Sequence, residues 1–109
     1  MGDRGNIKVG KVYLYTHWRG SFIKQILQKA LRRKARWNDE AYLTRIIFEE
    51  MIGIDTGSET GFGISTKIQD NEHPILEVDC ENQKIKCDDE SWTFEEFISL
   101  ENHDKEVNE

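Results

Sequence analysis

The chain has 109 residues, which suffices for one domain with a single hydrophobic core and is too short for two domains of ordinary size. Its composition, 33% charged and 37% hydrophobic with the apolar residues in periodic segments, predicts a folded domain with a charged surface and not a disordered chain. No apolar run approaches the roughly 20 residues of a membrane-spanning helix, and the N-terminus lacks the apolar stretch of a signal peptide, so we expect a cytoplasmic protein without membrane contact.

The charge is divided unevenly along the chain. Residues 1–36 carry ten lysines and arginines against the single acid Asp3, a net charge of +9, whereas residues 37–109 carry a net charge of −15. Such a distribution indicates either an acidic or phosphate-bearing partner for the first third, or two halves that neutralise each other in the fold.

The first predicted elements are two strands, residues 6–9 and 12–18, joined by a tight turn at Gly10-Lys11. Strict alternation places Ile7, Leu14 and their neighbours on a core face. The other face then carries a row of three ring-bearing side chains, Tyr13, Tyr15 and His17. We interpret this row as an interaction surface, unless the C-terminal helix folds back over it.

Two long helices follow. Ser21 is a candidate N-cap for a helix that ends near Arg33, and Asn38 or Asp39 for a second helix that runs to Ile52 and stops at Gly53. The first helix has one apolar stripe, and its opposite side gathers basic residues.

The remaining chain predicts a strand over 62–68, a hairpin over 74–87 and a short helix near the end. In the hairpin a turn at Asn82-Gln83 places Cys80 opposite Ile85, and we expect reduced, buried cysteines; a turn shifted by one residue would place Cys80 opposite Cys87 and leave a disulfide open. Thr93 and Glu96 form a capping box that begins the last helix. Residues 101–109 predict a disordered acidic tail.

These elements predict one α+β domain over residues 1–100 in the order ββααβββα. We expect an antiparallel sheet of about five strands with the two long helices packed on one face.

The first candidate site is the strand-to-helix junction at residues 16–21. A helix N-terminus attracts anions through its free amides and its dipole, and Arg19 adds a positive charge there. The alternative interpretation is that Ser21 simply caps the helix.

The second candidate site is a basic stripe on the first helix with an adjacent indole. Such a group can hold phosphates and stack a base. The alternative is a solvated helix face whose cations pair with acids elsewhere in the chain, which the sequence pI near 5.1 favours. The residues of this stripe are Lys29, Arg32, Arg33, Arg36 and Trp37.

The sequence contains no recognisable catalytic or metal-binding motif. The histidines lack helical partner ligands and the cysteines lack zinc spacing, so we expect no metal and no cofactor. A nucleophile such as Ser21 near His17 has no supporting motif.

Several strings of sequence are similar to a family of small uncharacterised bacterial and phage proteins. They cover most of the chain before the tail: residues 1–7, 12–18, 36–39, 42–48, 60–65 and 73–74. The resemblance implies a bacterial or phage intracellular setting, and it implies no activity and no catalytic residue.

Taken together, these patterns predict a non-enzymatic module that binds a protein or a nucleic acid through its basic N-terminal third. The alternative is a small hydrolase or transferase in which His17 acts as acid and base.

Overall fold

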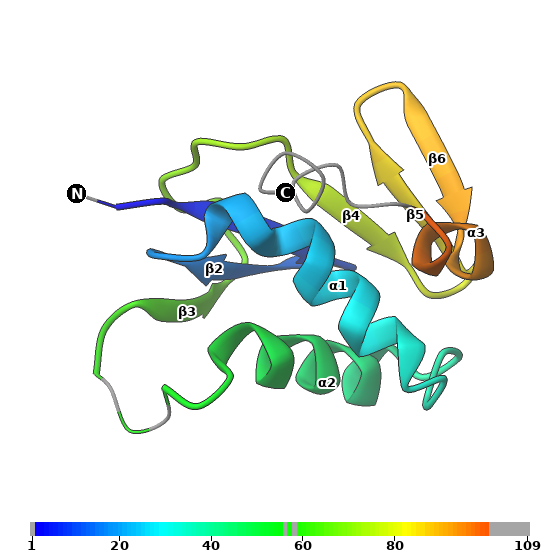
Figure 1. Cartoon of the computed structure of the whole chain (residues 1–109), viewed down its shortest axis with the longest axis horizontal. Helices are drawn as coiled ribbons and strands as arrows, with labels where there is room; N and C mark the ends of the chain where they lie inside the picture. The colour runs from blue at the N-terminus through cyan, green and yellow to red at the C-terminus, as the bar shows by residue number, and fades with distance from the viewer. Residues whose placement is uncertain (1, 56, 58, 101–109) are drawn as a thin grey trace, which may run out of the picture.

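The computed structural model describes residues 2–55, 57 and 59–100 of the chain. Within these residues the protein is α+β, with a mixed six-stranded sheet in the order β3-β2-β1-β4-β5-β6 and three α-helices. The helices lie on one side of the sheet, with α1 in front of its centre, α2 near β3 and α3 beside β5 and β6 (Figure 1). No helix in this described part combines the length and the apolar character needed to cross a membrane.

The N-terminal hairpin forms as the alternation predicts. Strand β1 (Gly5–Val9) pairs antiparallel with β2 (Val12–Thr16), and Ile7 lies opposite Leu14. Gly10 in the turn has φ +57°, a conformation that suits a residue without a side chain. Ile7 and Leu14 are fully buried, so the predicted core face of the hairpin is confirmed.

Helices α1 (Ile23–Arg32) and α2 (Glu40–Ile52) pack against each other and over this face. A short 3-10 turn, η1 (Gly20–Phe22), precedes α1. The Asp39 side chain caps α2 by accepting a hydrogen bond from the Tyr42 amide, and Gly53 ends the helix at φ +63°, as predicted.

The C-terminal part contains one strand more than the sequence predicted. Strand β4 (Leu76–Asp79) is followed by β5 (Lys84–Cys87), β6 (Glu90–Thr93) and α3 (Phe94–Ile98). The extra strand β6 was missed because Trp92 and Thr93 carry the helix-start signal; they end a strand and start the helix at once. The capping box of Thr93 and Glu96 is present, and the ring of Trp92 packs edge-on against Phe97.

Three other features of the predicted sheet are corrected. It is mixed, because β1 pairs parallel with β4 through Ile7 and Leu76, and the prediction of an antiparallel sheet is therefore only partly right. In the β4–β5 hairpin Ile85 faces Val78 instead of the predicted Cys80, because the turn is longer than the predicted two residues. Strand β3 (Phe62–Ser65) ends earlier than the predicted residue 68.

The connection from β3 to β4 is held against the sheet by Asn6. This residue is fully buried, and its Nδ2 donates to the carbonyl oxygens of Gln69 and Asp70 and to Oδ1 of Asn71. Arg4 binds the same connection through ion pairs with Asp70 and Glu72. The first strand thereby positions the segment that leads into β4. The predicted tail, residues 101–109, lies outside the described residues.

Candidate functional site

The sheet face without helices carries the predicted row of rings. In the register of the sheet, Tyr13 lies beside Lys8, Lys8 beside Glu77, and Glu77 beside Lys86, so one polar row crosses β2, β1, β4 and β5. Helix α3 packs against α1, β5 and β6 on the other face and leaves Tyr13 and Tyr15 half-buried. The row is therefore a surface of the molecule and not part of its core.

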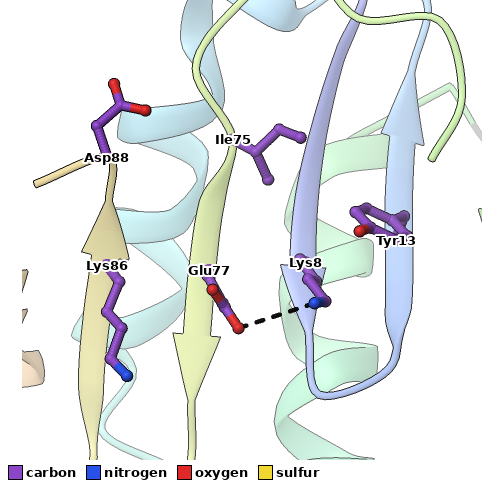
Figure 2. A pocket seen from close by; sticks show the side chains of 6 residues that line it. All are labelled: Lys8, Tyr13, Ile75, Glu77, Lys86 and Asp88. Carbon is purple, nitrogen blue, oxygen red and sulfur yellow. Dashed lines mark ion pairs between the residues drawn. The ribbon is translucent and has the colours of Figure 1, made fainter.

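A shallow cavity of about 310 Å³ lies on this face (Figure 2). The Lys8 Nζ lies 3.9 Å from a carboxylate oxygen of Glu77 and 5.6 Å from the centre of the Tyr13 ring. Two cations and two anions alternate around the cavity, so its charge is balanced and selects no anion. Its lining residues are Lys8, Tyr13, Ile75, Glu77, Lys86 and Asp88.

Tyr15 and His17 form a hydrogen-bonded pair at the end of the row. The Tyr15 hydroxyl lies 2.9 Å from Nδ1 of His17. Burial raises the pKa of Tyr15 above its usual value, so the phenol is neutral at physiological pH. Neither this cavity nor the groove described below reaches His17.

The predicted anion site at the start of the first helix is filled by the chain's own Asp3. Its Oδ2 accepts a hydrogen bond of 3.0 Å from the Ser21 amide, and its Oδ1 lies 2.6 Å from Nε2 of His73. The hydrogen bond from the Ser21 hydroxyl, assisted by His73, lowers the pKa of Asp3. Arg19 is also paired within the chain, through its guanidinium 3.0 Å from a carboxylate oxygen of Asp55.

Asp3, Glu72 and His73 place three potential metal-ligand atoms within 4.8 Å of one another. Each of these atoms already has a partner in the chain, because Arg4 binds Glu72 at 2.9 Å and Asp3 and His73 bind each other. A guanidinium beside the cluster also repels a cation. These contacts account for the cluster as a structural tie between the N-terminus, η1 and the β3–β4 connection.

Two cations of the basic stripe lie against acids of the acidic segment, residues 37–109. Arg33 forms ion pairs with Glu49 and Glu50 of α2, and Lys29 lies 3.8 Å from Glu50. The neighbouring Lys34 lies 3.6 Å from Glu95 of α3. The +9 segment is thus partly neutralised within the fold.

The other members of the stripe also have structural contacts. Arg32 donates to the carbonyl oxygen of Ile98, and the guanidinium of Arg36 lies 4.9 Å from the centre of the Tyr42 ring. Trp37 donates its indole hydrogen to the carbonyl of Leu31 and packs edge-on against Phe94. The stripe lies on the helix side of the molecule. The row of Tyr13, Tyr15 and His17 lies on the opposite face of the sheet, so the two candidate sites are separate.

Comparison with known proteins adds no function. No family model, curated protein or solved structure matches this chain. Four of the sequence strings noted above, residues 1–7, 12–18, 60–65 and 73–74, meet at one end of the sheet. Asp3 forms hydrogen bonds with His17 and His73, and the His17 amide donates to the carbonyl of Gly61. The candidate surfaces are therefore interpreted from their geometry.

The structure reveals a surface that the sequence patterns did not single out. Trp18, Phe62 and Ile64, here called the β3 surface, lie on the helix side of the sheet at the edge farthest from α3. Trp18 is 47% exposed and Ile64 58% exposed. The ring of Trp18 packs edge-on against Phe62, and a side chain on Gly61 would collide with the indole. The alternation of residues 62–68 was a signal for the strand, and only the strand order shows that it lies at an edge.

An apolar groove of about 530 Å³ adjoins the β3 surface. Val9 and Val12 from the first hairpin, Ala41 and Thr44 from α2, and Ile64 from β3 line it. Glu40 and Lys11 stand at its polar end. The groove lies between α2 and the edge of the sheet, where no further strand of the described residues pairs with β3.

Proposed function

We propose that this chain is a non-enzymatic protein-binding module whose partner contacts the β3 surface. The observation that carries the proposal is the exposure of Trp18 and Ile64 beside an apolar groove. Large apolar side chains grouped at one surface favour association with another protein, because burying them removes apolar area from water. Aromatic residues such as Trp18 are also enriched at the centres of protein interfaces.

Internal charge pairing supports a protein partner over a nucleic acid. Phosphate binding draws its affinity from cations that are free to replace counterions. Arg33, Lys29 and Lys34 already face acids of α2 and α3, and a net charge of −6 repels a polyanion at long range.

The test is capture of a partner by the whole chain on a resin, using a nuclease-treated lysate of the organism that encodes it. Ile64→Lys places a charge in the β3 surface, and Ser91→Lys makes the same change on the exposed edge strand β6 as a matched control. We expect a protein that is retained by the wild type and by Ser91→Lys and lost with Ile64→Lys. Retention of the same proteins by all three chains would refute the proposal.

A parallel titration addresses nucleic acid. Labelled single- and double-stranded oligonucleotides are titrated into the protein at low and at moderate salt. Phosphate contacts are strongest at low salt and weaken as the salt concentration rises. Binding at micromolar protein that falls with salt and is unchanged by Ile64→Lys would replace the protein partner by a nucleic acid. The expected result is no binding even at low salt.

The Tyr15–His17 hydrogen bond supports a second candidate, a small hydrolase or transferase with His17 as acid and base. A tyrosine hydroxyl on Nδ1 orients the imidazole and leaves Nε2 for chemistry. Hydrolysis of chromogenic ester and phosphoester probes by the wild type, abolished by His17→Ala and reduced by Tyr15→Phe, would establish it. Turnover that is unchanged in His17→Ala would eliminate it.

A further inference from the structure

The two edges of the described sheet differ in how they are protected. Proteins shield edge strands with charges, prolines or covering elements, because an open edge pairs readily with another chain. Strand β6 begins with Glu90, and α3 follows it directly and packs against it. Strand β3 reads Phe62-Gly63-Ile64-Ser65 and contains neither a charge nor a proline.

The backbone of β3 presents hydrogen-bonding groups to the outside. The His17 amide donates to the carbonyl of Gly61, and the register continues with Gly63 opposite Tyr15 and Ser65 opposite Tyr13. In an antiparallel pair, alternate residues bond to the neighbouring strand. The amides and carbonyls of Phe62 and Ile64 therefore point away from β2, in the direction of an added strand.

The groove provides room for the side chains of such a strand. Alternate side chains of a seventh strand would point to the helix side, over Ile64 and towards Ala41 and Thr44 of α2. Figure 1 shows α2 beside β3, and the first turns of α2 line the groove together with Ile64. The walls formed by Val9, Val12 and Ala41 favour small or β-branched apolar side chains.

Charge distinguishes the two ends of the edge. Lys11 precedes β2 and Lys67 follows β3, and the pairing of Tyr13 with Ser65 brings both lysines to the same end. Neither lysine forms an ion pair with a residue that the structure describes. Glu40 also lies in the groove, so these three groups carry a net charge of +1. A ligand with a carboxylate at this end complements that charge.

We propose that β3 binds an extended segment of a partner protein as a seventh strand of the sheet. The segment has apolar residues at alternate positions, which enter the groove beside α2, and an acidic residue at the end near Lys11 and Lys67. This recognition by strand addition takes affinity from main-chain hydrogen bonds and specificity from alternate side chains. The inference rests on the protein-binding function proposed above and names the kind of partner.

The experiment selects ligands from a displayed library of random ten-residue peptides against the whole chain. The selected peptide is then titrated into the isotopically labelled protein, and hydrogen exchange is followed at single amides by NMR. Strand addition predicts enrichment of alternating apolar peptides with an acidic end. It also predicts slowed exchange at the amides of Phe62 and Ile64, which point outward in the free protein.

Backbone and side-chain variants complete the test. Ile64→Pro removes the outward amide without touching the ladder to β2, and prolines are tolerated on edge strands. We expect at least a tenfold loss of affinity with Ile64→Pro and little change with Ile64→Val, which keeps both the amide and the apolar surface. If Ile64→Pro melts at a lower temperature than the wild type, the exchange rates of the Phe62 and Ile64 amides in the wild-type complex decide between strand addition and side-chain docking.

The possible results separate this inference from the function on which it rests. A peptide or captured protein that needs the Ile64 side chain but leaves the Phe62 and Ile64 amides unprotected would overturn strand addition and keep the protein-binding function. Failure both to capture a protein and to enrich a peptide would overturn both. Exchange of the Ile64 amide that slows with rising protein concentration in the absence of peptide would identify a second copy of the chain as the added strand. That result would overturn the proposal that a segment of a partner protein binds there.

Discussion

Replacement of Asp3 tests the tie between the N-terminus, the first helix and the β3–β4 connection. One carboxylate accepts hydrogen bonds from the Ser21 amide at 3.0 Å and lies 2.6 Å from Nε2 of His73. The main chain of the same residue binds Gly20 and His17. Only the side-chain contacts are lost on substitution, so the effect of the carboxylate can be isolated.

The magnitude follows from these contacts. Loss of a capping side chain costs about 0.5–2 kcal/mol, and a hydrogen bond to a charged group contributes about 1.5–3 kcal/mol. Since the Asp3 side chain is 32% exposed, solvent weakens both terms, and we expect Asp3→Ala to lower the free energy of unfolding by about 2–3 kcal/mol. Asp3→Asn keeps an acceptor for the Ser21 amide and should lose only about 1 kcal/mol.

The contribution of the charge depends on pH. The Ser21 hydroxyl and His73 hold the pKa of Asp3 below its ordinary value of 3.8 in the folded protein. A carboxylate with a depressed folded pKa stabilises the protein above its unfolded pKa, and this stability is lost as the pH falls through the folded pKa. The gap between the wild type and Asp3→Asn should therefore be constant above about pH 5 and shrink towards pH 3 and below.

Urea unfolding followed by circular dichroism at neutral and acidic pH measures these differences. Glu81→Gln, an exposed acid in the β4–β5 turn, serves as a control that should change stability by less than about 0.5 kcal/mol. A loss below about 0.5 kcal/mol for Asp3→Ala, or a gap to Asp3→Asn that does not change with pH, would show that the carboxylate does not hold the junction.

Three further predictions concern the core, the sheet face and the thiols. Gln28→Met removes the hydrogen bonds that the fully buried amide donates to the carbonyls of Phe97 and Leu100, and should cost about 2–4 kcal/mol in urea unfolding; an unchanged midpoint would mean that they do not anchor α3. The double variant Tyr13→Ser/Tyr15→Ser removes half-buried cross-strand contacts and should cost about 1–2 kcal/mol by thermal melting, whereas a loss above about 4 kcal/mol would place both rings in the core. Both cysteines are free thiols, and burial raises the pKa of Cys80 to about 11, so we expect an aromatic disulfide reagent at pH 8 to modify Cys80 far more slowly in the native protein than in urea; equal rates would contradict its burial.

Local signals predicted much of this fold. Alternation and a glycine turn predicted the first hairpin, and the caps at Asp39 and Thr93 mark the starts of their helices as expected. These features depend on residues that are close in sequence. Strand β6 was missed because its four residues overlap the helix-start signal of Trp92 and Thr93, and a short strand has too few positions for alternation to show.

Long-range features were not predictable from the same patterns. The parallel pairing of β1 with β4, and the buried hydrogen bonds of Asn6 with the β3–β4 connection, join residues far apart in the chain, and no local pattern reports such contacts. The alternation of Tyr13, Tyr15 and His17 predicted their shared face, whereas the exposure of Ile64 follows from the strand order, which leaves β3 at an edge. The acidic partners of Arg33 lie in another helix, so the sequence showed the basic stripe without its neutralisation.

The parallel pairing in the middle of the sheet bears on the order of events in folding. Both halves of the sheet, β3-β2-β1 and β4-β5-β6, consist of antiparallel pairs. Short turns join β1 to β2, β4 to β5 and β5 to β6, whereas β3 reaches β2 only after α1 and α2. The halves join only where Ile7, Lys8 and Val9 meet Leu76, Glu77 and Val78, across most of the chain. A nascent chain therefore exposes β1 until β4 has been synthesised, and the joining of the two halves is the step at which synthesis speed and chaperone binding would control the yield of native protein.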